Sequence, residues 1–480
     1  MSERRIAGPF NRVEGDLEIA LDIADGRIAA AYVDSPMYRG FEQILQGKAP
    51  ADALVLVPRI CGICSVAQSA AGALALADAA AIEPPPNGRL AANLTLATEN
   101  LADHLTHFYL FFMPDFARAE YAGRSWHAAT AARFRATTGS AVEQVLPART
   151  RFMQLMGLIA GKWPHTLAVQ PGGSTRPLQG SDLFRLHRHL REFRDFLERA
   201  TFAAPLEEVA AIDSIAALDT WAGAGAGDLR SFLRIAADLG LWQVGRGTDV
   251  LMSYGCYAEE GGRLFPPGLW RGGLHPLDVG AIREDVAFSR YAAGGELLHP
   301  GEGSTVPLVE KAGAYSWCKA PRLGGDVVET GAFARQAIAG HPLVRDILAC
   351  HGSSVAARVV ARMLELALVL PAMERWLGQL KAGEAWCTTG PMADETSGVG
   401  LVEAARGSLG HWLTVRRGRI HNYQIIAPTT WNFSPRDAAG QPGTLERALE
   451  GLPVDAQGEI PGIVHHVVRS YDPCMVCTVH

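Results

Sequence analysis

Two Cys-x-x-Cys pairs lie near opposite ends of this 480-residue chain, and they constrain its fold more than any other feature. The first pair is Cys61 and Cys64, and the second is Cys474 and Cys477, just before the final residue, His480. Four cysteines in two such pairs are a strong signal for a metal held by thiolates. Local zinc sites usually close within a short stretch of chain, because short loops cost little entropy to close. A shared site here therefore requires the C-terminus to fold into the centre of the protein beside an early segment.

The composition fits a globular protein with a sizeable core, since 48% of the residues are hydrophobic and 20% are charged. The net charge of −6 and the lack of a polybasic run argue against a nucleic-acid partner. Eight cysteines are too few for a disulfide scaffold, so a reduced, cytoplasmic location is expected. We expect no signal peptide and no direct membrane span, because the uncharged run over 60–77 contains Gly, Ser and Gln and is predicted to be a buried helix.

Hydrophobic periodicity predicts a set of long helices, over 90–112, 147–159, 181–203 and 355–380. An Ala-rich helix is expected over 65–80, because Ala has the best helix propensity. Alternating apolar residues beside Asp25-Gly26 predict an N-terminal β-hairpin. We therefore expect a single large α+β domain, predominantly α, with a central bundle of long helices and small peripheral β-sheets.

The predicted domain, residues 1–480, divides into four segments. They are the N-terminal hairpin with the first cysteine pair (1–80), a helical core (90–203), a Gly-rich irregular region (221–345), and the C-terminal helix with the second cysteine pair (355–480). A short helix is predicted over 277–285. The sequence contains no repeat of 20–50 residues and no phosphate-binding glycine motif, so nothing marks a nucleotide site.

Three kinds of metal suit four thiolates: zinc, iron in a cluster, and a redox-active metal such as nickel. A structural zinc needs only a closed tetrahedral shell. Here polar residues adjoin both pairs: Arg59 lies near Cys61, Asp472 lies near Cys474, and His480 with the terminal carboxylate offers a second metal anchor. These neighbours favour a catalytic metal, while a structural zinc stays open.

The segments around both cysteine pairs resemble the two cysteine motifs of [NiFe]-hydrogenase large subunits. The likeness extends along the whole chain, through Arg12-Val13-Glu14-Gly15, Arg39-Gly40-Phe41-Glu42, Asp103-His104, His107-Phe108-Tyr109, Trp317-Cys318-Lys319-Ala320-Pro321-Arg322, Glu403, Arg406-Gly407, His411-Trp412 and Pro428-Thr429-Thr430-Trp431-Asn432. Several independent motifs in the same order make a chance match negligible.

The resemblance implies a nickel bound by Cys61, Cys64, Cys474 and Cys477. In that family pattern Cys64 and Cys477 would also bridge to an iron that carries CO and cyanide, a NiFe(CN)2CO centre, while Cys61 and Cys474 would be terminal ligands of nickel. Soft thiolates suit such a thiophilic metal pair.

The resemblance also implies reversible, heterolytic cleavage of H2, with the proton passing to a basic thiolate, for which Cys474 is the candidate. Glu14 would then carry that proton away, although the residue alone reads as a solvated strand charge. This role needs burial to raise the pKa of its carboxyl toward neutrality. Arg406 would lie over the metals, with Asp103 and Asp472 as its neighbours.

Two further groups of residues are assigned by resemblance. Thr429 would donate a hydrogen bond to a cyanide, and Pro428 belongs to the same cofactor-binding segment. Glu42, the backbone carbonyl of Ile425, and His480 would hold a magnesium ion, with water completing the octahedron.

Three positions depart from the pattern of catalytic members. Gln68 stands where they usually carry histidine; its N–H can still donate to a bridging thiolate, but it cannot titrate. Ile63 and Phe111 stand where they line the gas channel with valine and leucine. The larger side chains should narrow the passage, admitting hydrogen and hindering oxygen, whereas ordinary core variation would explain either residue alone.

The end of the chain is a further departure. Catalytic large subunits are made with a C-terminal extension that a protease removes after nickel insertion, whereas this sequence ends at His480. Either the chain is shown in processed form, or the gene encodes no tail. Together with Gln68, Ile63 and Phe111, this ending resembles the regulatory, hydrogen-sensing branch, in which a slow, oxygen-tolerant enzyme reports H2 to a histidine kinase.

We favour that sensing role over two alternatives. One is a catalytic H2-uptake hydrogenase in processed form, and the other is a non-catalytic relative with a structural zinc. The remaining cysteines are scattered singly along the chain: Cys256, Cys318, Cys350 and Cys387. Iron–sulfur clusters are therefore expected only in a small partner subunit, which implies a heterodimer or a dimer of heterodimers.

Overall fold

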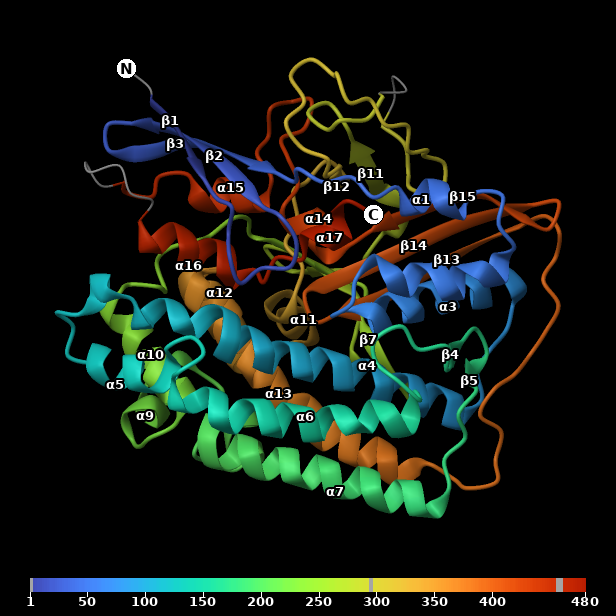
Figure 1. Cartoon of the computed structure of the whole chain (residues 1–480), viewed down its shortest axis with the longest axis horizontal. Coiled ribbons are helices and arrows are strands. Elements are labelled where there is room, and N and C mark those ends of the chain that lie inside the picture. Colours follow the sequence, from blue (N-terminus) through green and yellow to red (C-terminus); the bar gives the residue numbers. More distant parts are fainter. Residues whose placement is uncertain (1–2, 293–296, 455–460) are drawn as a thin grey trace.

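Four long helices pack together as a bundle in the computed structural model, which describes residues 3–292, 297–454 and 461–480 (Figure 1). They are α4 (Pro86–Thr106), α6 (Ser140–Ile159), α7 (Gly180–Phe196) and α13 (Val355–Gln379). Helix α4 packs against α6 and α13, and α7 packs against the same two helices. The prediction of a predominantly helical α+β domain with a central bundle is confirmed.

The largest difference between a predicted and an observed helix end is at the start of α6. We expected a helix to begin at Pro147, but α6 begins at Ser140 and Pro147 lies inside it. Pro147 is exposed, so water can bind the carbonyl that the proline leaves without a donor. Helices α4 and α7 each continue into a π-helical turn, over His107–Phe112 and Leu197–Thr201.

A three-stranded antiparallel sheet supports the Ala-rich helix α3 (Ser65–Ala80) (Figure 1). Its strands are β13 (Thr396–Ala404), β14 (Gly407–Arg416) and β15 (Arg419–Ile426), in that order. Helix α3 is largely buried, as expected for the uncharged run over 60–77.

Helix α3 approaches β13 closely because glycine faces alanine. A Cβ atom on Gly398 would lie 2.1 Å from the carbonyl oxygen of Ala75, and one on Gly400 would lie 1.9 Å from that of Ala71. No side chain fits at either strand position. This contact fixes the depth at which α3, and therefore Cys64 just before its first residue, is held in the protein.

The N-terminal hairpin is present as predicted. Strands β1 (Glu3–Ala7), β2 (Glu18–Ala24) and β3 (Arg27–Asp34) form an antiparallel sheet in that order, with Asp25 and Gly26 in the β2–β3 turn. The connection between β1 and β2 contains Glu14, whose backbone pairs with that of Cys474.

The Gly-rich region contains short elements: α9 (Ile215–Gly223), α10 (Asp228–Asp238), β6 (Val250–Ser253), β7 (Cys256–Glu259), β8 (Gly262–Phe265), β9 (Gly268–Arg271), β10 (Leu274–His275), β11 (Ile282–Asp285), β12 (Ala320–Leu323) and α11 (Ala332–Ala339). The helix predicted over 277–285 is wrong, because 282–285 form β11, paired antiparallel with β12. That partner lies far along the chain, so local periodicity does not reveal it.

The remaining elements are short: α1 (Phe41–Leu45), α2 (Ala53–Leu56), α5 (His127–Phe134), β4 (Val169–Gln170), β5 (Gly173–Ser174), α8 (Leu206–Ala210), α12 (Pro342–His351), α14 (Pro428–Asn432), α15 (Thr444–Leu449), α16 (Gly462–Ser470) and α17 (Met475–Thr478). The chain ends inside the protein next to α17, and His480 is 4% exposed (Figure 1). Across the described ranges, no helix is both long and apolar enough to cross a membrane. The four-segment division stays a prediction.

Candidate metal centre

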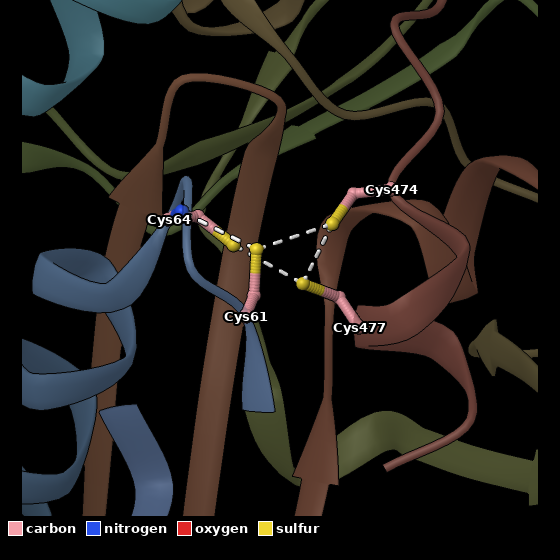
Figure 2. A group of neighbouring side chains, drawn as sticks. All are labelled: Cys61, Cys64, Cys474 and Cys477. Atoms are coloured by element: carbon pink, nitrogen blue, oxygen red, sulfur yellow. Dashed lines mark hydrogen bonds between the residues drawn. The ribbon is translucent and has the colours of Figure 1, made fainter. Parts of the chain in front are cut away.

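The two cysteine pairs meet in the interior, although they lie at opposite ends of the chain (Figure 2). Cys64 precedes α3, whereas Cys474 precedes α17 and Cys477 lies within it. The Sγ–Sγ distances are 3.5 Å between Cys61 and Cys474, 3.1 Å between Cys64 and Cys477, and 3.0 Å between Cys474 and Cys477. All four side chains are buried.

These distances fit thiolates around a metal. They are too long for disulfides, whose S–S bond is about 2.0 Å, and all four cysteines are free. With metal–sulfur bonds of about 2.3 Å, two sulfurs on one metal lie on the order of 3–4.6 Å apart. All four sulfur atoms lie within 4.8 Å of one another, so they can share a metal.

The buried thiols also need a nearby cation if all of them are to ionise. Burial raises the pKa of Cys64 and of Cys474 well above the ordinary value. Burial likewise opposes ionisation of Cys61, but contacts with the other three thiols and the charge of Arg406 lower its pKa well below that value. Without a metal, these neighbours therefore cannot all be thiolates, because like charges in a buried site repel. A bound divalent cation removes that obstacle.

Arg406 lies beside the thiols, at the turn between β13 and β14. Its Nε donates to the carbonyl oxygen of Asp472 at 2.7 Å, and its Nη2 donates to Oδ1 of Asp472 at 3.0 Å. Oδ1 of Asp103, on α4, accepts a hydrogen bond from Nη2 at 3.1 Å. Oδ2 of the same carboxylate forms an ion pair with Nη1 at 3.0 Å. Burial opposes the charge on Arg406, but the two carboxylates raise its pKa well above the ordinary value. Burial raises the pKa of Asp103 to about 6, against the effect of Arg406.

Glu14 is tied to the C-terminal segment by its backbone. Its N–H donates to the carbonyl of Pro473 at 3.3 Å, and its carbonyl accepts from the N–H of Met475 at 2.7 Å. Gly15, at φ +82°, permits this approach, since a Cβ there would lie 3.0 Å from Val476. The side chain of Glu14 is half-buried, and burial, with the charge of nearby Cys61, raises the pKa of its carboxyl.

Thr429 contacts the centre from the start of α14. Its Oγ1 accepts a hydrogen bond from the N–H of Cys474 at 3.1 Å. Because the hydroxyl acts as an acceptor there, its own hydrogen stays available to donate toward the site. Pro428 begins the same helix and is buried with it.

The polar group around Glu42 lies at the C-terminus. His480 Nε2 is 3.3 Å from Oε1 of Glu42, and the N–H of Ile425 donates to the same oxygen at 2.8 Å. The structure therefore brings the backbone of Ile425 against Glu42 through its amide, and the role of its carbonyl as a ligand stays a prediction. Burial alone would raise the pKa of Glu42, but Lys319 and His480 lower it to about 2.

Lys319, Glu284 and Gln424 belong to this polar group but have no predicted role. Lys319 Nζ lies 3.4 Å from Glu42, 3.4 Å from Glu284 and 2.8 Å from the side-chain oxygen of Gln424. Lys319 falls within one of the motifs that resemble the family, so the sequence could have identified it as a site residue. Glu284 and Gln424 carry no such signal, because long-range packing alone brings them here.

Ile63 and Phe111 line the same small cavity, of about 20 Å³. Asp103, Met153 and Trp163 contribute to its wall. This volume is close to the minimum needed for a single water molecule. The two residues thus border a space for one small molecule, and that space reaches Asp103 beside the thiols.

Glu99 also lines this cavity and was not predicted. Its carboxylate accepts hydrogen bonds from the N–H groups of Val66 and Ala67, both at 2.9 Å, and from Trp163 Nε1 at 2.8 Å. It therefore anchors the first turn of α3 next to Cys64. Burial raises its pKa to about 8, although these donors oppose the shift.

Comparison with known proteins supplies the family. The family model described as "Nickel-dependent hydrogenase" matches residues 39–143 and 141–480. The periplasmic [NiFeSe] hydrogenase large subunit of Desulfomicrobium baculatum is 30% identical over 518 residues, covering 98% of this chain and 94% of that one. The uptake hydrogenase large subunit of Azotobacter chroococcum mcd 1 is 30% identical over 581 residues, with coverage of 99% and 95%.

A solved structure agrees with these relatives. The Ni-Fe-Se hydrogenase from D. vulgaris Hildenborough in the reduced state superposes with a TM-score of 0.85 at 30% identity, and all of both chains is covered. Two of these names include selenium, whereas each of the four clustered positions here is a cysteine. Since the family match extends from residue 39 to the last residue and the solved structure matches the full length, this chain belongs to the nickel-dependent hydrogenase family and is a hydrogenase.

Proposed function

We propose that this chain is the large subunit of an H2-oxidising, uptake-type [NiFe] hydrogenase. The observation that carries the proposal is the convergence of four buried thiols beside Arg406 and Glu14. The names of the relatives, which include an uptake and a periplasmic hydrogenase, support oxidation of H2 over sensing.

Cys61, Cys64, Cys474 and Cys477 would hold the nickel, with Cys64 and Cys477 shared with an iron that carries CO and cyanide. When bound, this metal pair supplies the heterolytic cleavage of H2. Soft sulfur donors are the ligands that such metals prefer. Within the part of the chain that the structure describes, no other cysteines cluster, so electrons would leave through an iron–sulfur subunit that pairs with this one.

Proton transfer would use Cys474 and Glu14. The thiolate of Cys474 accepts the proton, and the carboxylate of Glu14 takes it toward the surface. The backbone hydrogen bonds between the Glu14 loop and the C-terminal segment keep these two residues adjacent. The raised pKa of Glu14 brings its carboxyl closer to the pH at which it can both accept and release a proton.

Arg406 would supply a fixed positive charge over the thiolates. Asp103 and Asp472 hold its guanidinium by two-pronged contacts, so it needs no reorganisation when charge develops at the site. Thr429 would donate its free hydroxyl hydrogen to a cyanide, with Pro428 beside it.

Glu42 and His480 would bind magnesium, with the Ile425 carbonyl as a third ligand. Their donor set is poor in oxygen, so water must complete the octahedron. The ammonium of Lys319 already compensates part of the charge of Glu42, and it would anchor such waters together with Glu284.

Hydrogen sensing is the second candidate function. The specific observation in its favour is the small cavity bordered by Ile63 and Phe111, together with Gln68 beside Cys477. A narrow passage suits a slow enzyme that works in air. The kinase partner, the oxygen tolerance and the cytoplasmic location stay predictions.

The small cavity that Ile63 and Phe111 border gives a testable prediction. Ile63→Val combined with Phe111→Leu should make inactivation by O2 several-fold faster, because both changes enlarge the cavity. The measurement is the half-life of H2 oxidation under air. Ile347→Val with Phe232→Leu is a matched control, since both residues are buried and neither lines this cavity. Equal half-lives for the parent and the double variant would show that Ile63 and Phe111 do not hinder the access of O2.

The experiment that decides between the two functions uses the purified heterodimer. An uptake enzyme should reduce a viologen dye with H2 at a sustained rate and should not retain a histidine kinase on co-purification. Slow dye reduction with a stably bound kinase would instead establish the sensing role. A protein that contains only zinc and catalyses neither H2 oxidation nor H/D exchange would overturn both functions.

A further inference from the structure

Gln68 connects the metal-binding thiols to a buried His–Tyr pair. Its Nε2 lies 3.9 Å from Sγ of Cys477, and its Oε1 lies 2.8 Å from Nε2 of His411. The other ring nitrogen of His411, Nδ1, lies 2.8 Å from the hydroxyl of Tyr423. Exposure of Gln68 is 1%, and that of His411 and Tyr423 is 0%. Four residues from α3, β14, β15 and α17 thus form one chain of direct, buried contacts.

The direction of each hydrogen bond follows from donor counting. The Oε1 of an amide only accepts, so Nε2 of His411 must carry the hydrogen. A neutral imidazole has a single N–H, so Nδ1 accepts from the Tyr423 hydroxyl. Burial lowers the pKa of His411 to about 3, which keeps the ring neutral. Tyr423 makes no second side-chain hydrogen bond within the described ranges, so its hydroxyl hydrogen is committed to His411.

A reversed amide is the competing arrangement. In that case Nε2 of Gln68 would donate to His411, and Oε1 would face Cys477. An amide oxygen directed at a thiolate is repelled by it, and in a buried site this repulsion is poorly screened. The orientation in the structure instead directs an N–H at the sulfur, a charge-assisted contact. The His411 tautomer protonated at Nε2, with Nδ1 accepting from the Tyr423 hydroxyl, is the one that matches this amide orientation.

We propose that His411, set by Tyr423, is a positioning residue that holds the Gln68 amide with its N–H toward Cys477 and so withdraws electron density from that thiolate. This inference rests on the proposed function, because Cys477 is the thiolate assigned to both metals. Unlike the histidine expected at this position in catalytic members, Gln68 would tune the sulfur with a group that cannot titrate.

Infrared spectroscopy of the purified heterodimer reads this effect. Less electron density on Cys477 means less density on the iron and weaker donation into its CO, which raises the CO stretching frequency. His411→Phe should release the amide and shift the CO band to lower wavenumber, and Tyr423→Phe should shift it less in the same direction. His189→Phe is the matched control, because His189 is buried on α7 and lies 3.8 Å from the carboxylate of Glu192 rather than beside the thiols. It should leave the band in place.

A double variant separates positioning from general disturbance. If His411 acts through Gln68, His411→Phe should cause no further shift in a Gln68→Leu background, since the two changes then remove one interaction. An equal shift in both backgrounds, or an unshifted band in His411→Phe, would overturn the proposal.

The hydrogen position gives a test that needs no CO ligand. With ¹⁵N-labelled histidine, the signals that disappear in His411→Phe should be those of a neutral ring protonated at Nε2. Signals of a ring protonated at Nδ1 would contradict the inference. A heterodimer without CO bands would count against the proposed centre, and the ¹⁵N result would still decide the role of His411.

Discussion

Glu14→Gln is expected to lower H/D exchange and H2 oxidation by about 10²–10⁴-fold, the usual contribution of a positioned acid–base group. Glutamine has nearly the same shape, and the backbone bonds of residue 14 to Pro473 and Met475 do not involve its side chain. Nickel content should therefore stay at the parental value. The measurement is isotope exchange between D2 and water, followed by mass spectrometry, together with metal analysis of the same sample.

Glu18→Gln is the control for this experiment. Glu18 lies on β2, a short distance along the same hairpin, and pairs with Asp34 on β3 rather than with the C-terminal segment. Its replacement should leave exchange unchanged. Parental exchange rates in Glu14→Gln would show that protons leave the thiolates by another path.

Arg406→Lys is expected to lower activity by about 10²–10³-fold, the cost of removing a preorganised donor from a reacting centre. A lysine keeps the charge but cannot make the two-pronged contacts to Asp103 and Asp472. The lost hydrogen bonds should also lower the free energy of unfolding by about 1–3 kcal/mol. Activity and thermal unfolding of the purified heterodimer measure the two effects separately.

Arg335→Lys tests whether burial alone explains the result. Arg335 is 0% exposed and pairs with Glu365 and Glu403, so its replacement should cost a similar stability. It should leave most of the activity per bound nickel. A comparable loss of activity per nickel in both variants would mean that Arg406 has only a structural role.

The sequence predicts most of the elements that position the centre. Hydrophobic periodicity identifies the four bundle helices, and alanine content identifies α3, because these signals are local. The sequence also predicts that the two cysteine pairs meet, since one metal held by all four cysteines requires this contact. Resemblance adds Arg406, Asp103 and Asp472 as one cluster, and the structure brings these three residues together.

What the sequence does not predict depends on long-range packing. Strand β11 pairs with β12 across a long intervening segment, so a helical pattern over 277–285 misleads. Glu99 has no motif, yet it anchors the start of α3. Gly398 and Gly400 have a low strand propensity, and only the close packing of α3 against them explains why both positions are glycine.

Three residues bear on the branch of the family to which the chain belongs. In the sequence, Gln68, Ile63 and Phe111 favour a sensor, and the structure places all three around the thiols or the adjoining cavity. Those positions affect how fast gas reaches the centre and how the sulfur is tuned. Both effects are compatible with an uptake enzyme, so turnover and partner measurements have to decide.

Metal analysis of the purified heterodimer tests whether the four thiols hold nickel, on which every proposed role depends. We expect nickel to be bound to the parent protein in stoichiometric amount. We also expect Cys61→Ser and Cys474→Ser to lose that nickel, and Cys256→Ser, at a buried cysteine outside the cluster, to retain it. Zinc in place of nickel in the active preparation, or nickel that survives both ligand replacements, would contradict this expectation.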